Sequence, residues 1–188
     1  MFYKGQIVVY PAQGPGVIED LERREIGGCE TEFYVIRILS GNTRVLVPVG
    51  NAVNVGLRVP CTPDEARAAL DALRDSGGRA GSWGQNWNRR YREYTERLKS
   101  PSLREVCGVL KELFLLSGRK ELSFGERRLQ EQAMSLVAAE LACVLKKDVC
   151  EIRSSIERLF ADAAAGGEKE GDAPLPCPAT SATGCESA

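Results

Sequence analysis

The densest group of positive side chains in this sequence surrounds a tryptophan. The segment Trp87-Asn88-Arg89-Arg90-Tyr91-Arg92 interleaves arginines with aromatic residues, and Arg97 and Lys99 follow it. Guanidinium groups neutralise phosphates, and an aromatic side chain can stack on bases or be inserted between them. These residue types at this spacing favour binding to nucleic acid. The alternative is that Trp87 and Tyr91 belong to a helical core while the arginines form a solvated face, as most runs of charge do.

A second basic group lies where the sequence predicts the start of the longest helix. Its members are Arg119, Lys120, Arg127 and Arg128. Because a helix amino terminus presents free N–H groups and the positive end of the helix dipole, basic residues there can clamp a phosphate. The competing interpretation is simple solubility, with neighbouring glutamates as local partners.

Two absences restrict the chemistry of the chain. The sequence contains no histidine, which removes the commonest general base and every Ser-His or Cys-His nucleophile pair. The seven cysteines include no Cys-x-x-Cys pair, so neither a zinc site nor a disulfide framework is indicated. We therefore expect that the protein is not an enzyme and that it has no catalytic, metal-binding or cofactor-binding residues. A thiol-based redox sensor is a further hypothesis, because Cys150 follows Lys146 and Lys147.

The first sixty residues have the composition of β-structure. Short runs rich in β-branched and aromatic residues are bounded by turn formers: Ile7–Tyr10, Gly16–Ile18, Phe33–Leu39 and Arg44–Val47. Gly27-Gly28 predicts a tight turn between two of them. We expect residues 1–60 to form a small, strongly bent antiparallel sheet or an SH3-like barrel.

Residues 61–160 have the periodicity of a helical bundle. Five amphipathic stretches follow capping residues, and the predicted helices begin at Thr62, Asn86, Ser100, Ser123 and Asp148. Gly77-Gly78 ends the first helix, a linker leads to the second, and the last helix runs to Phe160. The predicted fold class is therefore α+β, a small antiparallel β domain followed by an all-α helical bundle domain.

From about Ala161 the chain loses large apolar side chains, and its remaining charges sum to −4. Such a segment cannot offset its ordering entropy by burial, so residues 161–188 are expected to form a disordered acidic tail. No run of about 18 apolar residues occurs, and the first residues lack the pattern of a secretory signal. We expect a cytoplasmic protein with no membrane association.

Several short motifs follow one another in a fixed order through both halves. They are Val8-Val9-Tyr10-Pro11, Gly16-Val17-Ile18-Glu19, Glu32-Phe33-Tyr34-Val35, Val47-Pro48, Asn86-Trp87-Asn88-Arg89-Arg90-Tyr91 and Leu122-Ser123-Phe124-Gly125-Glu126-Arg127-Arg128-Leu129. From about Phe2 to Leu145, this order resembles the CarD/CdnL family of RNA-polymerase-binding bacterial transcription regulators.

The resemblance implies a Tudor-like first domain that binds the β subunit of bacterial RNA polymerase. It implies a helical second domain that contacts promoter DNA in the minor groove, largely independently of sequence, at the upstream edge of the melted bubble. Such proteins stabilise the open complex and are not enzymes. We expect a monomer that is associated with the nucleoid through the polymerase.

The resemblance also implies roles for particular residues in DNA binding. Trp87 matches a tryptophan wedge that enters the minor groove where duplex meets bubble, at an unstacking cost of a few kcal/mol per base step. Arg92 and Arg127 match basic positions facing the DNA backbone. Arg89 and Arg90 belong to the same motif, and the alternative for one of them is internal packing. Trp83, four residues before Trp87, is the alternative wedge.

The resemblance also leads us to expect polymerase contacts at three further residues. Arg24 matches a basic contact, Ile26 lies on the same presumed strand, and Leu46 falls where relatives carry a basic or apolar residue. An exposed strand edge would allow main-chain pairing with the polymerase. The alternative function is a polymerase or partner adapter without direct DNA contact. Phosphate contacts would give a steep dependence of affinity on salt, and an adapter would not.

Overall fold

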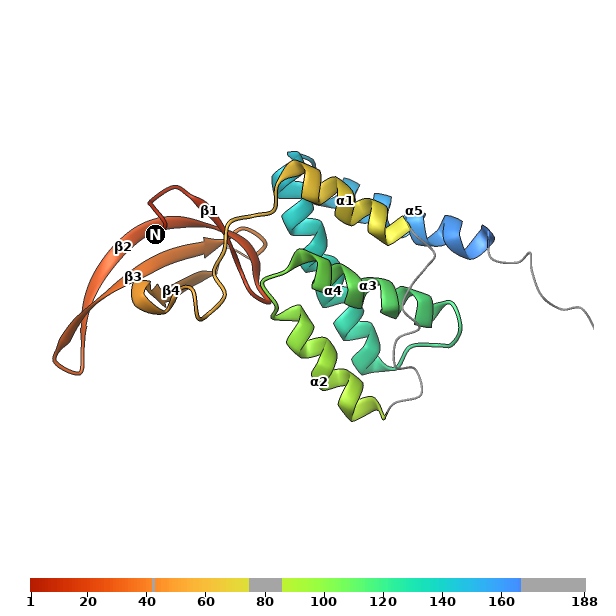
Figure 1. The fold of residues 1–188 in the computed structure, drawn as a ribbon, viewed down its shortest axis with the longest axis horizontal. Coiled ribbons are helices and arrows are strands. Elements are labelled where there is room, and N and C mark those ends of the chain that lie inside the picture. Colours follow the sequence, from red (N-terminus) through yellow and green to blue (C-terminus); the bar gives the residue numbers. More distant parts are fainter. Residues whose placement is uncertain (42, 75–85, 167–188) are drawn as a thin grey trace, which may run out of the picture.

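Four strands form one antiparallel sheet in the order β1-β2-β3-β4. The strands are β1 (Ile7–Tyr10), β2 (Gly14–Ile26), β3 (Cys29–Ile38) and β4 (Arg44–Pro48), followed by the short 3-10 helix η1 (Val49–Asn51). A computed structural model describes residues 1–41, 43–74 and 86–166 of the chain. In Figure 1 the sheet forms one lobe, and five helices form a second lobe beside it.

One face of the sheet carries the core of the first lobe. The register sets Ile18 opposite Ile36 and Tyr34 opposite Val47, so these buried side chains share a face. Leu57, which follows β4, also joins this cluster. The sheet therefore curls over an apolar core, with β1 and β4 at its edges. The small bent antiparallel sheet predicted from the sequence is confirmed.

The central hairpin is longer than the sequence pattern predicts. β2 continues past Ile18 to Ile26, and β3 begins at Cys29 rather than at Phe33. This extension is rich in charged residues, so it lacks the apolar alternation by which a strand is predicted from sequence. In the structure, charged residues of β2 and β3 pair across the two strands. Between the strands Gly27 and Gly28 have φ values of 63° and 81°, the left-handed conformation that a tight two-residue hairpin turn requires.

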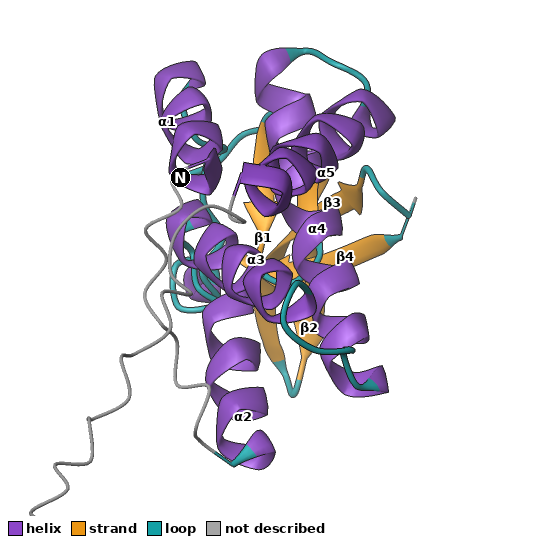
Figure 2. Cartoon of the chain, turned by 90° about the vertical axis from the view of Figure 1, so that its right-hand side faces the viewer, coloured by secondary structure: helices purple, strands orange, loops and turns teal. Residues whose placement is uncertain are grey.

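The second lobe is a bundle built around one long helix. Its helices are α1 (Pro63–Arg74), α2 (Trp87–Leu98), α3 (Leu103–Ser117), α4 (Phe124–Leu145) and α5 (Val149–Gly166). α4 packs against the four other helices and also against β2 (Figure 2). Its inner face buries Val137 and Leu141 fully, beside Leu110 of α3 and Ile156 of α5. The α+β class is thereby confirmed.

Two helix boundaries differ from those predicted. α3 begins at Leu103 with Ser102 as the capping residue, because Ser100 instead accepts a hydrogen bond from the Ser102 N–H at 3.2 Å. α5 continues past Phe160 to Gly166, so residues 161–166 are helical, although the sequence assigns them to the disordered tail. The four alanines in this stretch are strong helix formers, which a search for large apolar residues overlooks. The predicted linker with Trp83, and the predicted tail beyond Gly166, lie outside the described residues. Within the described part of the chain, no helix combines the length and apolar character needed to cross a membrane.

Candidate nucleic-acid interface

Trp87 is the first residue of α2, and its indole is held by three neighbours. Asn86 caps the helix by accepting a hydrogen bond from the Asn88 N–H at 3.2 Å. The indole lies across Gly125 of α4, so closely that a Cβ atom there would be 2.6 Å from Cζ2 of the tryptophan. The Tyr91 ring is 5.6 Å away, and the Arg90 guanidinium lies 5.8 Å from the ring centroid. The side chain is therefore half-buried and fixed in position.

Arg90 does not lie on the surface with the other arginines of its segment. It is only 7% exposed, and its Nη2 donates to Oε1 of the buried Glu126 at 3.1 Å. A guanidinium committed to an internal ion pair does not reach a DNA phosphate. The sequence-based assignment of Arg90 to the DNA contacts is therefore corrected. Arg90 joins α2 to α4 beneath the tryptophan.

Glu126 is the centre of this junction. It completes a capping box, because its carboxylate accepts from the Ser123 N–H at 2.8 Å and the Ser123 hydroxyl accepts from the Glu126 N–H. Lys120 also donates to both carboxylate oxygens, at 3.1 and 3.2 Å. Burial alone would raise the pKa of Glu126, but these hydrogen bonds from Ser123 and Lys120 outweigh it and lower the pKa. The carboxylate is therefore charged at neutral pH.

The contacts of Trp87 with Gly125 and of Arg90 with Glu126 bring the two basic groups to one end of the bundle. Arg89 and Arg92 are exposed on α2 and line a shallow hollow with Asn86. Arg127 is exposed on the first turn of α4, where it donates to the Leu122 carbonyl at 3.0 Å and pairs with a neighbouring glutamate. A half-exposed indole with cations on both adjoining helices can neutralise phosphates and fill a gap between bases.

The predicted DNA-binding residues omit two exposed aromatic side chains at this end of the bundle, Phe124 of α4 and Tyr91 of α2. Phe124, directly before Gly125, is 84% exposed, although its side chain is large and apolar. Tyr91, for which a position in the helical core was the alternative, is exposed and lies against the indole. The sequence signal for Phe124 is its place at the first position of a predicted helix, directly after the capping Ser123.

The three predicted polymerase-contact residues share the outer face of the sheet, opposite the core. Arg24 and Ile26 are two residues apart on β2, as are Glu22 and Asp20 before them, so these side chains point to the same side of the strand. Asp20 is opposite Val35 of β3, and Val35 is in turn opposite Leu46 of β4. Because cross-strand partners point to the same side, this register puts all of them on one surface, which we call the outer sheet face. Ile26 and Leu46 are exposed large apolar residues there.

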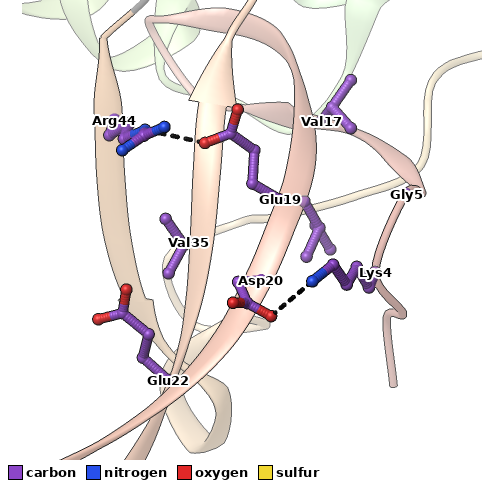
Figure 3. A pocket seen from close by; sticks show the side chains of 9 residues that line it. Lys4, Gly5, Val17, Glu19, Asp20, Glu22, Val35 and Arg44 are labelled. Carbon is purple, nitrogen blue, oxygen red and sulfur yellow. Dashed lines mark hydrogen bonds and ion pairs between the residues drawn. The ribbon is translucent and has the colours of Figure 1, made fainter.

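Charged side chains on the outer sheet face are paired with one another. Glu19 pairs with Arg37 at 2.6 Å. It also pairs with Arg44 at 2.8 Å, and Lys4 pairs with Asp20 at 3.0 Å (Figure 3). The hydrogen bond from Arg37 is the chief cause that lowers the pKa of Glu19. Arg24 is paired too, with Glu22 at 2.6 Å. A shallow hollow over Val17 and Val35 is lined by the charged residues Lys4, Glu19, Asp20, Glu22 and Arg44. This surface offers both apolar and charged groups for docking.

The thiols of the buried Cys107 and the partly buried Cys61 are poor candidates for redox chemistry. Burial raises the pKa of Cys107 to about 12 and that of Cys61 to about 11, so both stay protonated at neutral pH. Cys150, on which the redox hypothesis depends, is exposed at the start of α5. Among the residues that the structure describes, no group of three or more Cys, Asp or Glu side chains could hold a metal ion.

Comparison with known proteins gives matches in both lobes. Residues 2–58 match the family model for the CarD-like/TRCF RID domain, and residues 69–157 match the model for the CarD C-terminal domain. The chain is also 26% identical over 144 residues to the "Putative transcription factor YdeB" of Bacillus subtilis (strain 168). That alignment covers 77% of this chain and 92% of the relative. The two family matches correspond to the sheet and to the bundle.

Proposed function

The chain belongs to the CarD family of transcription factors, and from this premise we propose that it bridges bacterial RNA polymerase and promoter DNA. In this proposal the outer sheet face binds the β subunit of the polymerase. The α2–α4 end of the bundle contacts DNA at the upstream edge of the melted bubble and stabilises the open complex. The protein acts as a monomer in the cytoplasm, held near the nucleoid by the polymerase.

The observation that carries the DNA role is the placement of Trp87. An indole that is half-exposed, fixed by Gly125 and Tyr91, and flanked by Arg89 and Arg92 is already ordered before it meets a ligand. Little side-chain entropy is therefore lost when it enters the gap between separated bases. Filling that gap opposes reannealing, while the arginines neutralise phosphates on either side.

The polymerase role is supported by the open parts of the sheet. Beyond Ile18, and among the residues that the structure describes, β2 is hydrogen-bonded on one side only, to β3. An extended segment of the polymerase can add to such an edge through main-chain hydrogen bonds. Ile26 and Leu46 then supply apolar contacts on the outer sheet face, and Arg24 supplies a charge.

The test is the lifetime of preformed open complexes with purified bacterial RNA polymerase. We expect the wild-type protein to lengthen this lifetime and Trp87→Ala to lose most of the gain. The loss of an aromatic contact with a base costs about 1–3 kcal/mol, or roughly 5-fold to 150-fold in lifetime. Tyr3→Ala, which removes an exposed aromatic ring from the other lobe, is the control and should act as wild type. Equal lifetimes for wild type and Trp87→Ala would refute the role of Trp87.

A second candidate function is an adapter that binds the polymerase and a protein partner without touching DNA. Pairing of surface arginines favours it, because Arg127 is paired with Glu121. Titration of a forked promoter fragment at several salt concentrations separates the two functions. A steep negative slope of log K against log[salt] supports DNA contact, and a slope near zero supports the adapter.

A further inference from the structure

The two lobes are joined by hydrogen bonds around Arg58, which lies where the chain leaves the sheet. The backbone of Arg58 pairs with Val9 of β1 in both directions, at 2.7 and 3.3 Å. Its guanidinium donates to both carboxylate oxygens of Glu140 on α4, at 2.6 and 2.8 Å. The Cys61 N–H donates to the same carboxylate at 3.2 Å. We call this set, the Arg58 guanidinium, the Glu140 carboxylate and the Cys61 N–H, the interlobe clasp.

Apolar packing beside the clasp brings the sheet and the bundle into direct contact. Gly14 of β2 has a φ of 93°, and a Cβ atom built there would lie 3.8 Å from Leu136 and 4.0 Å from Ala139 of α4. Tyr10 and Leu103 also face the narrow hollow between the lobes. Such apolar contacts are non-directional, so they hold the two lobes together without fixing the angle between them.

The clasp is directional, and its burial makes it sensitive to any change in angle. The Glu140 side chain is 4% exposed and that of Arg58 is 21% exposed. A two-point guanidinium–carboxylate pair has strict planar geometry, and a buried pair adds little net stability because both ions lose their hydration. If the lobes rotated, Glu140 would be left buried without its partner. The pair therefore selects one arrangement of the lobes rather than strengthening either lobe.

We propose that Arg58 and Glu140 are positioning residues that set the angle between the outer sheet face and Trp87. This inference rests on the proposed function. A protein that holds polymerase with one lobe and DNA with the other gains from a fixed spacing, because rigid linkage raises the effective concentration of the second contact. The clasp supplies that linkage without touching either partner.

The first test measures the arrangement of the lobes in the free protein. Dyes are placed on unnatural residues at the exposed positions Glu30 and Gln132, and energy transfer is recorded from single molecules. We expect one narrow distribution of energy-transfer efficiency for the wild type and a broadened or shifted distribution for Arg58→Met. The control is Arg153→Met, which removes a similar two-point pair with Glu131 within the bundle and should leave the distribution narrow. A distribution for Arg58→Met that superimposes on the wild type would overturn the inference.

A second variant guards against a loss of folding. Glu140→Gln keeps an acceptor for the Cys61 N–H but loses the charge that orients Arg58. If Arg58→Met lowers the near-ultraviolet circular dichroism signal, and so disturbs the fold, the energy-transfer distribution of Glu140→Gln tests the inference instead. We expect that distribution to broaden, and one that superimposes on the wild type would overturn the inference.

The second test asks whether the angle matters at the promoter. We expect Arg58→Met to shorten the open-complex lifetime by roughly threefold to tenfold, while affinities for polymerase alone and for forked DNA alone stay unchanged. A broadened distribution with an unchanged lifetime would overturn the positioning role. If wild-type protein itself failed to lengthen the lifetime, the proposed function would fail, and the energy-transfer result would still decide whether the clasp fixes the lobes.

Discussion

Replacing Gly125 by alanine moves the Trp87 indole without removing any charge or any aromatic ring. The new Cβ atom would lie 2.6 Å from Cζ2 of the tryptophan and 3.3 Å from Cη2, whereas ordinary contacts of this kind begin at 3.4 Å. The methyl group belongs to the rigid first turn of α4, so the indole must give way by about 1 Å.

The variant is expected to fold at least as well as the wild type. Alanine favours a helix over glycine by up to about 1 kcal/mol, so the midpoint of thermal unfolding should stay the same or rise. The contact of the Trp87 indole with DNA bases should weaken, because such a contact is worth about 1–3 kcal/mol and depends on the position of the ring. We expect to lose about 1 kcal/mol of that contact, which is about a fivefold shorter open-complex lifetime.

Gly118→Ala is the matched control in the same lobe. Gly118 also gains a methyl group, but its nearest neighbour, the Leu115 carbonyl, lies at an ordinary contact distance of 3.7 Å. Its open-complex lifetime should equal that of the wild type. If Gly125→Ala were as active as the wild type at equal occupancy of the polymerase, the position of Trp87 would not matter and our reasoning would be wrong.

Three other predictions address charge and docking. Because the folded protein lowers the pKa of Glu126 from 4.5, the stability that this carboxylate contributes is present above pH 4.5 and is lost as pH falls below it. Glu126→Gln should therefore flatten the loss of unfolding free energy in acid, and a pH profile identical to the wild type would contradict this. Arg92→Ala should weaken binding to forked DNA and reduce the salt slope by about 0.9, and an unchanged slope would show that Arg92 contacts no phosphate. Leu46→Asp should weaken polymerase binding by at least about 1 kcal/mol without lowering the unfolding midpoint, and unchanged affinity in a pull-down titration would exclude the outer sheet face near Leu46.

The sequence predicts elements whose cause is local. Ser123 and Glu126 are three residues apart, so the capping box at the start of α4 is readable from the sequence, and the structure contains both of its hydrogen bonds. Gly27-Gly28 likewise predicts a tight turn, and both residues adopt positive φ. The charged arms of that hairpin were missed because ion pairing, such as that of Arg23 with Glu32 at 2.8 Å, leaves no apolar periodicity.

The sequence does not predict contacts that depend on distant residues. Nothing in the order of three nearby arginines says that Arg90 faces inward, because the cause is Glu126 on another helix. The support of Trp87 by Gly125 and the pairing of Arg58 with Glu140 are of the same kind, since neither partner has meaning until the bundle is assembled. Tertiary packing therefore decides which members of a motif reach the surface.

The most direct test of the proposed bridging function maps where the α2–α4 end of the bundle lies in an open complex. A photo-crosslinking aromatic residue at Tyr91 lies beside Trp87, with ring centroids 5.6 Å apart in the wild type, and leaves the tryptophan itself unchanged. We predict crosslinks to promoter DNA at the upstream edge of the bubble, only when polymerase has opened the promoter, and none from the same residue placed at Tyr3. Crosslinks confined to polymerase, or spread along duplex DNA regardless of melting, would contradict the account.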